Sequence, residues 1–397
     1  MKKRKKKLGR PNPILLFLAY IILTPYYKIK YHLSIDRRAL RGIKGPALIL
    51  APHISRCDHL IIAMALYPIR PTFVLSEHFM MNKKLRPILK RMHVITKKMF
   101  CSDAGTIMGI LRAKNEKNVI VLFPEGRLTW YGHSLKITDG TSQLVKKLGC
   151  DVYTVTGNGA YLTFPKWSKL PRRGKINVTA SKLLSGADIS AMKDDEIERA
   201  ISNAILHDEE KAMEGTKYSC SDMTEGLDGI LYRCPECRRE FTMTSGGGEI
   251  KCTCGMTARL DEYYKFHGSR FSTVNEWYDW QQKELDTAVP LKSRARVGTP
   301  DENGFMVPDA GEGEIYLDRH RFYFSGTVRG EKTEFMIPAE KLKAFPITVA
   351  KEFDVRYGGR LYYMYPLPDT RAAVKWVSYL DKINAERSSV KTNRTDK

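Results

Sequence analysis

The chain has 397 residues, of which 43% are apolar and 28% are charged, a composition that is ordinary for a globular protein and excludes wholesale disorder. Its length predicts two or three domains. The formal net charge of +22 is not ordinary. It predicts an anionic partner, which could be nucleic acid, an anionic membrane face or an acidic protein such as an acyl carrier.

Basic residues are concentrated at the start of the chain, ahead of an apolar stretch at residues 14–27. At about 1.5 Å per residue this stretch would span roughly 21 Å, less than the ~30 Å hydrocarbon core. No small-residue cleavage site follows it, so we expect an uncleaved anchor within residues 1–30 that lies in or dips into one leaflet. Tyr20, Tyr26 and Tyr27 suit the membrane interface. The alternative is a core helix behind a disordered basic tail.

The segment Pro52–Asp58 follows a buried strand predicted at Leu48–Ala51 and precedes an apolar helix. His53 is therefore expected at the carboxyl end of a strand, and Asp58 in the first turn of the next helix. Neutral imidazole can take a proton from an alcohol, and a carboxylate on its other ring nitrogen fixes the tautomer. Since there is no serine or cysteine elbow, the pair favours direct attack by a substrate hydroxyl on an activated acyl group. Taken alone, this short pattern is more often an unrelated histidine and aspartate.

A second motif, Phe123-Pro124-Glu125-Gly126-Arg127-Leu128-Thr129, follows another predicted strand. The two motifs together resemble the glycerophospholipid acyltransferase family, the superfamily of lysophosphatidate acyltransferases, over roughly residues 31–205. The resemblance implies that His53 is the general base on a glycerol hydroxyl and that Asp58 orients it. It also implies that the second motif contacts the glycerophosphate acceptor, through the predicted residues Glu125, Gly126, Arg127 and Thr129.

The chain departs locally from the family's motifs. In the family's own numbering, the Phe123–Thr129 segment is the third motif. Its commonest form has arginine one position later, and the version here is similar to the branch that acts on 2-acyl-glycerophosphoethanolamine. In a separate segment, which the family numbers as its second motif, this chain has Lys97 and Lys98 where the family has an arginine, and lysine supplies a point charge without a bidentate fork. The fourth motif has Thr154 in place of its usual proline. We expect Lys97, Lys98 and Arg127 to hold the acceptor phosphate.

Residues 31–215 alternate strand and helix patterns and predict an acyltransferase domain with a mixed, largely parallel α/β sheet and flanking helices. Helices are predicted at Ala104–Lys114, capped by Ser102 or Asp103, and at Thr141–Leu148. A charged helix at Asp194–Met213 is expected to close the domain. The strands are predicted at Leu48–Ala51, Thr72–Leu75, Val94–Thr96, Val119–Phe123, Val152–Thr156 and Ile176–Ala180.

Four cysteines in residues 216–265 are paired across a predicted hairpin: Cys234, Cys237, Cys252 and Cys254. This spacing predicts a small zinc ribbon, in which four thiolates hold a structural Zn²⁺. Disulfides are the alternative for paired cysteines, and a cytosolic site disfavours them. We expect the ribbon to serve docking or stiffening; nucleic-acid binding is the alternative for this module.

The remaining chain predicts a helix and linker at 266–310, a β-rich domain at 311–388 and a disordered tail at 389–397. The helix is expected at Ser272–Leu285, and Asp301–Gly313 is expected to be a loop. A final amphipathic helix is predicted at Thr370–Arg387. Short strands closed by one helix resemble a pleckstrin-homology-type barrel in topology. The strands are predicted at Gly313–Leu317, Arg321–Ser325, Thr333–Pro338, Ala344–Val349, Phe353–Tyr357 and Leu361–Pro366.

These features predict a membrane-associated O-acyltransferase whose catalytic domain lies on the cytoplasmic face of an anionic membrane. The acceptor is expected to be 1-acyl-glycerol-3-phosphate, with lysophosphatidylethanolamine as the alternative, and the donor acyl-CoA, acyl carrier protein or acyl phosphate. Acyl transfer by this route requires no metal or organic cofactor. The competing class is a non-enzymatic zinc-ribbon protein that binds lipid or nucleic acid. Nucleic acid is disfavoured because it does not require a His–Asp pair and a Glu-Gly-Arg turn at two strand ends.

Overall fold

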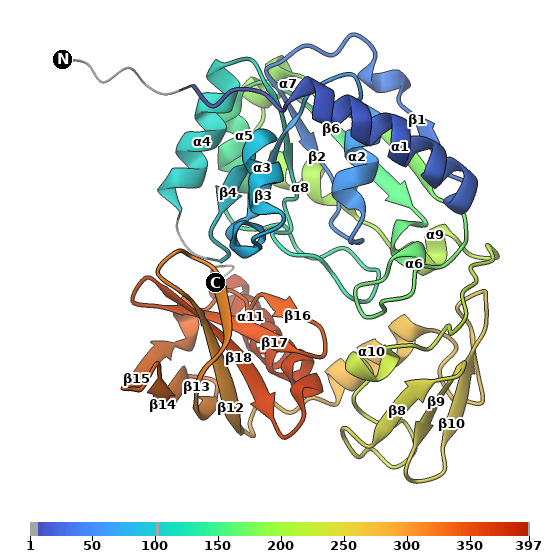
Figure 1. Ribbon diagram of the computed structural model, residues 1–397, viewed down its shortest axis with the longest axis vertical. Helices are drawn as coiled ribbons and strands as arrows, with labels where there is room; N and C mark the ends of the chain where they lie inside the picture. The colour runs from blue at the N-terminus through green and yellow to red at the C-terminus, as the bar shows by residue number, and fades with distance from the viewer. Residues whose placement is uncertain (1–6, 101–102, 396–397) are drawn as a thin grey trace. The chain divides into compact units, whose positions relative to one another are not determined.

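A computed structural model describes residues 7–100 and 103–395, with side chains described as far as Ser388 (Figure 1). The predicted basic residues 2–6 and the alternative cap Ser102 lie outside the described residues. The chain forms two compact units. The first comprises the chain to Lys166 together with Leu170–Cys220, and the second comprises Trp167–Lys169 and Ser221–Lys397.

The first unit is built on a seven-stranded sheet in the order β1-β7-β6-β2-β5-β3-β4. Neighbouring strands are parallel except for β6 and β7, which pair antiparallel. The predicted mixed, largely parallel α/β sheet is therefore confirmed. The strands are β1 (Ser34–Asp36), β2 (Ala47–Leu50), β3 (Thr72–Ser76), β4 (Ile95–Lys97), β5 (Val119–Leu122), β6 (Asp151–Asn158) and β7 (Asn177–Leu184).

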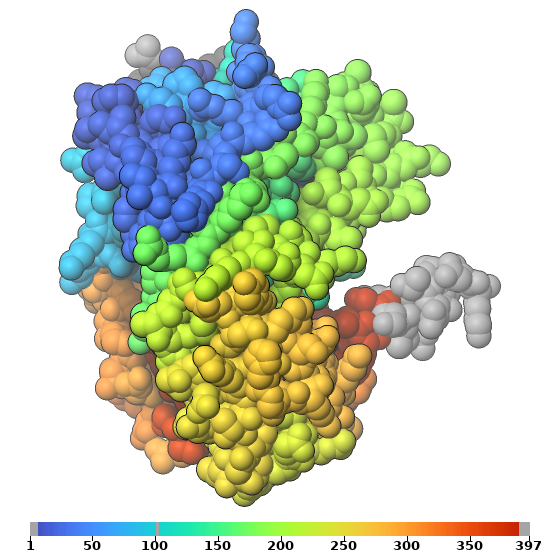
Figure 2. All heavy atoms as spheres, turned by 90° about the vertical axis from the view of Figure 1, so that its right-hand side faces the viewer, coloured from blue at the N-terminus to red at the C-terminus, as the bar shows by residue number. Residues whose placement is uncertain are grey.

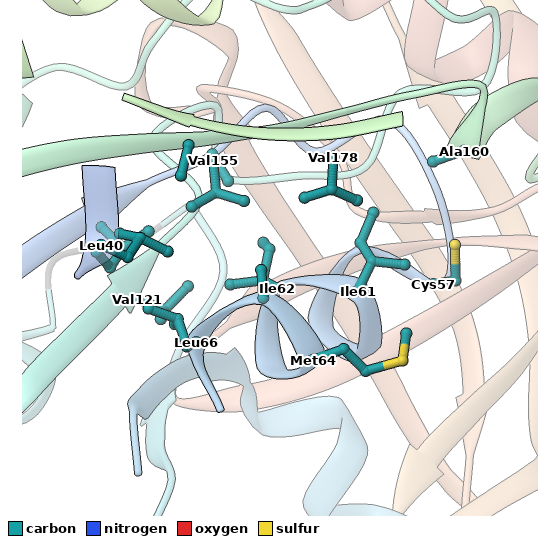
Figure 3. Close-up of a cluster of buried hydrophobic side chains, with 14 of the residues drawn as sticks. Leu40, Cys57, Ile61, Ile62, Met64, Leu66, Val121, Val155, Ala160 and Val178 are labelled. Carbon is teal, nitrogen blue, oxygen red and sulfur yellow. The ribbon is translucent and has the colours of Figure 1, made fainter. Parts of the chain in front are cut away.

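Alternating side chains of the central strands pack into two separate cores, one on each face of the sheet. Ile49 of β2 joins the core beneath α1 and α2, where Ile61 and Ile62 pack (Figure 3). Leu48 and Leu50 point the other way, into the core that α4, α5 and α8 cover. The helices of this unit are α1 (Pro13–Tyr31), α2 (Asp58–Leu66), α3 (Arg86–Arg91), α4 (Ala104–Asn115), α5 (Thr141–Leu148), α6 (Ala160–Thr163), α7 (Gly186–Ala191), α8 (Asp194–Ile205) and α9 (Glu209–Ala212).

The helix predicted at Asp194–Met213 is wrong as one continuous element. It is split into α8 and α9 by residues 206–208. The His207 amide donates to the Ser134 hydroxyl at 2.8 Å, and the His207 carbonyl accepts from the Ser134 amide at 3.0 Å. Asp208 then caps α9 by accepting from the Lys211 amide. These bonds to a distant segment take the backbone out of the helix, which local periodicity could not indicate.

The N-terminal helix α1 has 19 residues and continues through Pro25 to Tyr31, so it is longer than the predicted apolar stretch. By length and composition alone it is long enough and apolar enough to cross a membrane. One side packs on the domain: Tyr27 is buried, and Tyr20 stacks on Tyr67 with ring centroids 3.9 Å apart. Of the three tyrosines expected at a membrane interface, Tyr26 is the one that is exposed.

The second unit begins with a four-stranded antiparallel sheet in the order β11-β10-β9-β8, which contains the predicted cysteine hairpin. The turn between β8 and β9 is fixed by Asp222, which accepts from the amides of Gly247 and Gly248. The elements are β8 (Met243–Gly246), β9 (Glu249–Cys252), β10 (Thr257–Leu260), β11 (Phe266–His267) and the following helix α10 (Val274–Lys283).

A seven-stranded antiparallel sheet in the order β15-β14-β13-β12-β18-β17-β16 follows, and the helix α11 (Ala373–Thr395) packs on it. The predicted β-rich C-terminal region is confirmed. The loop expected at Asp301–Gly313 is wrong from Met306 onward, because that acidic segment pairs with β12 and β14. The strands are β12 (Leu291–Pro300), β13 (Met306–Leu317), β14 (Arg321–Val328), β15 (Glu331–Pro338), β16 (Ile347–Thr348), β17 (Glu352–Tyr357) and β18 (Arg360–Leu367).

Candidate active site

His53 and Asp58 meet across the turn between β2 and α2. The His53 Nδ1 atom lies 2.8 Å from Asp58 Oδ2. The same oxygen accepts from the backbone amides of Ile54 and Ser55 at 3.0 and 2.9 Å. Burial raises the pKa of Asp58 well above its ordinary value, and the amide hydrogen bonds from Ser55 and Ile54 act against this rise. Because three donors converge on one oxygen, the ionised carboxylate fits this site and keeps the His53 proton on Nδ1, which leaves Nε2 as the free base.

The two motifs hold each other through the backbone of His53. Its amide donates to Glu125 Oε2 at 3.2 Å, and its carbonyl accepts from the Thr129 amide at 3.0 Å. Glu125 and Thr129 are both buried, and burial raises the pKa of Glu125 to about 8. The His53 ring stacks on Phe123 with centroids 4.2 Å apart. We infer that Glu125 and Thr129 position His53 by bonding its backbone. The family resemblance had instead implied that both residues contact the acceptor.

Gly126 is the turning point of the second motif, with a φ of +77° that favours glycine. A Cβ atom at this position would lie 2.8 Å from Thr138 Cγ2 and 3.8 Å from Lys97 Nζ. Thr138 closes the turn by donating through its amide to the Pro124 carbonyl at 2.8 Å. The close approach of Lys97 therefore brings one predicted cation to the motif that was expected to bind the acceptor.

Three cations lie around the second motif, and sequence reasoning had identified two of them. Arg127 lies over the Trp130 ring at 5.2 Å, and the Lys166 Nζ atom lies 5.7 Å from the same ring centroid. Lys166 also donates to the Leu128 carbonyl at 3.5 Å. Lys98, in contrast, is exposed, and its amide donates to Asp103, the cap of α4. Lys97, Arg127 and Lys166 thus form the cationic cluster of this site.

Burial and the charge of Lys166 lower the pKa of His53 from its ordinary value to about 3. Neutral imidazole is the form that can accept a proton, so His53 is ready to act as a base across the neutral range. No local sequence signal links Lys166 to His53, since 112 positions separate them and no motif includes the lysine.

We expect Lys166→Met to raise the pKa of His53, because removing a nearby cation makes the imidazolium less unfavourable. A base must be deprotonated, so the acid limb of kcat/KM should move to higher pH. The measurement is kcat/KM against pH for wild type and variant. Lys169→Met, which removes a neighbouring lysine, is the control and should leave the limb in place. An unchanged limb in Lys166→Met would contradict this electrostatic link.

An apolar cavity of about 180 Å³ lies next to the His–Asp pair. His59 lines it, and the His59 ring meets the His53 ring edge-on with centroids 5.4 Å apart. The other lining residues come mainly from three helices or the segments beside them, and they include Leu16, Tyr20, Leu23, Ala63, Leu89 and Met92. The lining is almost entirely hydrocarbon, so the cavity suits a fatty acyl chain.

A second buried histidine–carboxylate pair supports the site and was missed in the sequence. His207 Nε2 lies 2.5 Å from Glu209 Oε2, and Glu209 is fully buried. The other carboxylate oxygen of Glu209 accepts from the Tyr161 amide at 2.9 Å. The backbone amide of Glu209 donates to the Gly132 carbonyl at 3.1 Å. In α6, the Ala160 carbonyl accepts from Ser55 of the first motif at 2.8 Å. Glu209 therefore connects the segment just after the second motif to α6, which in turn contacts the first motif.

The four predicted cysteines converge in the second unit, with their sulfur atoms all within 4.8 Å of one another. Cys234–Cys254 and Cys237–Cys252 have Sγ atoms 3.8 Å apart. That separation is far above a disulfide bond of about 2.05 Å. It equals the edge of about 3.8 Å that a tetrahedron with 2.3 Å metal–sulfur bonds would have. The cluster can hold a metal ion, and the disulfide alternative does not fit.

Residues 28–157, about a third of the chain, match the family described as Acyltransferase. This part of the chain therefore belongs to the acyltransferase family, which confirms the prediction made from its two motifs. Among solved structures, the chain is similar to a 1-acyl-sn-glycerophosphate (LPA) acyltransferase from Thermotoga maritima. The identity is 14% and the TM-score 0.42, over 48% of this chain and 76% of that chain.

Proposed function

We propose that this acyltransferase transfers a fatty acyl group to the free hydroxyl of a lysophospholipid. His53 Nε2 takes the proton of the acceptor hydroxyl while the hydroxyl oxygen attacks the acyl carbonyl carbon. The tetrahedral intermediate then collapses, the bond from carbon to the carrier breaks, and the proton leaves with the carrier. Asp58 holds the His53 tautomer and stabilises the imidazolium. The short distance between His53 Nδ1 and Asp58 Oδ2 supports this step.

The favoured acceptor is 1-acyl-sn-glycerol-3-phosphate, which would be converted to phosphatidate. The observation that carries this choice is the cluster of Lys97, Arg127 and Lys166 around the second motif. Several converging cations suit a doubly charged phosphate monoester better than a zwitterionic phosphoethanolamine headgroup. The third-motif sequence keeps lysophosphatidylethanolamine as the second candidate. The donor could be acyl-CoA, acyl carrier protein or acyl phosphate, with its chain in the cavity beside His59.

The catalytic unit would work at a membrane surface, on the cytoplasmic side where such donors are found. The outer side of α1 supports this proposal because it exposes a row of apolar side chains: Ile14, Phe17, Leu18, Ile21, Ile22 and Ile29. Since the opposite side of the same helix packs on the domain, α1 fits a helix that lies in the interface. The four-cysteine cluster would hold a structural Zn²⁺ through Cys234, Cys237, Cys252 and Cys254 and stabilise the ribbon.

The test is an acylation assay with purified full-length protein in detergent or liposomes. Labelled acyl donors of the three classes would be combined with lysophosphatidate, lysophosphatidylethanolamine and lysophosphatidylcholine. We expect diacyl product with lysophosphatidate from the wild type and a loss of about 10³-fold or more with His53→Ala. Preference for lysophosphatidylethanolamine would favour the second candidate. Full activity in His53→Ala, or failure of every pair, would refute the enzyme mechanism and favour a lipid-binding role.

A further inference from the structure

A basic groove lies at the amino-terminal edge of the acyltransferase sheet. Two adjoining cavities of about 380 and 530 Å³ form it, and they share the residues Ile43, Pro68 and Ile69. The cations that line the groove come from four separate segments of the first unit: Arg10, Arg37, Arg38, Arg41, Lys44, Arg70 and Lys117. None of the described residues that line the smaller cavity is acidic.

The groove is separate from the site that contains His53. Lys44 and Lys117 precede β2 and β5, which pair in parallel with Ala47 opposite Val119, so both lysines lie where these strands begin. His53 and Glu125 follow the other ends of the same strands. At about 3.3 Å per strand residue, the four residues of each strand alone separate the two ends by roughly 13 Å, and the flanking residues add to this distance. A ligand in the groove could not contact the catalytic histidine.

Two guanidinium groups of the groove, those of Arg10 and Arg70, are held by neutral acceptors, which leave their charge available. Arg10 donates to Asn118 Oδ1 at 3.0 Å and to the Lys117 carbonyl at 3.2 Å. Arg70 donates to the Pro11 carbonyl at 3.4 Å. The groove has fewer carboxylates than cations: Asp36 lines the larger cavity, and Glu116 directly precedes Lys117. Asp36 forms an ion pair with Arg38, and Glu116 accepts from the amides of Leu8 and Gly9. The groove therefore carries a net positive charge.

The groove adjoins α1, whose outer side is exposed and apolar. Tyr67, which lines the larger cavity, stacks on Tyr20 of α1, and Arg10 stands three residues before the helix begins. In Figure 2, α1 (dark blue) and the segment that follows it (blue) lie side by side on one face of the unit. Cations beside an apolar surface helix are the pattern of a membrane interface, where the apolar side enters the acyl region and the cations reach headgroups.

We propose that the basic groove binds the phosphate headgroup of an anionic lipid while α1 lies in the same leaflet, as a lipid site distinct from the catalytic one. Phosphate accepts charge-assisted hydrogen bonds from guanidinium and ammonium groups. This contact fixes how the acyltransferase unit lies on the membrane. An acidic acyl carrier docked here would have to bring its thioester past the whole sheet to reach His53, so the location favours a lipid headgroup.

The experiment is cosedimentation of the full chain with three kinds of vesicles: phosphatidylcholine alone, and phosphatidylcholine mixed with phosphatidate or with phosphatidylglycerol. The test variant is Lys44→Gln/Lys117→Gln. The matched control is Lys147→Gln/Lys193→Gln, which removes two exposed lysines that do not line the groove. We expect the test variant to bind both anionic vesicles about 25-fold more weakly than wild type, at about fivefold per cation, and phosphatidylcholine equally well.

An equal loss in the control pair would overturn the proposal, because general charge would then explain the binding. So would wild-type affinity of the test variant for anionic vesicles. Calorimetry with inorganic phosphate separates the sources: if free phosphate binds the groove as tightly as the vesicles do, the groove is not a lipid site. Acylation of detergent-dispersed lysophospholipid should be unchanged in the test variant. This second readout keeps a failure of the groove distinguishable from a failure of the proposed enzyme.

Discussion

Replacing Asp58 with asparagine is expected to lower kcat by about 10²-fold or more while the protein stays folded. The asparagine oxygen can still accept from the amides of Ile54 and Ser55, which bond the aspartate at 3.0 and 2.9 Å. The same oxygen would still accept from His53 Nδ1, because all three donors meet one carboxylate oxygen. The neutral amide would no longer stabilise the imidazolium that forms when the base takes the acceptor proton. Steady-state kinetics with the favoured acceptor would measure this loss.

The matched control is Asp195→Asn, the same chemical change on the exposed side of α8, where Asp195 pairs with Arg199. It should keep activity within about twofold, because exposed ion pairs contribute little. Circular dichroism and thermal unfolding of both variants would separate catalysis from folding. If Asp58→Asn were folded and fully active, the carboxylate would not orient His53, and the proposed mechanism would be wrong.

Removing one thiolate of the cysteine cluster is the second change with a large expected effect. We expect Cys237→Ser to lose the bound metal, from about one zinc per chain to well below that, and the hairpin of β8 and β9 to unfold locally. Metal binding contributes about 10–16 kcal/mol to the folding of small zinc modules at neutral pH, and a hydroxyl is a poor substitute for a thiolate. Elemental analysis after gel filtration would measure the metal, and hydrogen exchange over residues 234–254 would measure the unfolding.

Cys220→Ser is the control for the cluster, because Cys220 is a cysteine outside the group of four. It should retain both metal and protection from exchange. The prediction would be refuted by full metal content in Cys237→Ser. It would equally be refuted if the wild type, prepared with zinc present, bound none and had a well-protected hairpin. In that case the sulfur geometry would be stabilised by packing alone.

Local sequence patterns were sufficient for the sheet that positions the proposed catalytic pair. The apolar runs before His53 and Glu125 are short and continuous, and such runs bounded by turn signals indicate buried parallel strands. The cap of α4 and the bounds of α5 were equally local, because a capping side chain and a terminal glycine act within a few residues. For the same reason the cysteine spacing predicted the cluster that the structure brings together.

Elements whose conformation depends on distant partners were missed. The N-terminal part of β13 is rich in glycine and acidic residues and has low strand propensity, yet it is extended because β12 and β14 lie on both sides of it. The break between α8 and α9 likewise comes from Ser134, more than 70 positions earlier. No periodicity within the segment itself carries that information.

The sequence by itself determined the chemistry: a histidine and an aspartate five residues apart at a strand end, and a turn whose glycine permits a positive φ. Both motifs depend on neighbours in the chain, so their geometry follows from local backbone preferences. The tertiary structure decided which charges reach the site. It brought Lys97 and Lys166 to the second motif and placed Lys98 beside Asp103. It also paired His207 with Glu209, which bonds the backbone of Gly132 and Tyr161. Side chains separated by tens of residues meet only when the sheet and its helices pack, and that packing is set by the whole core.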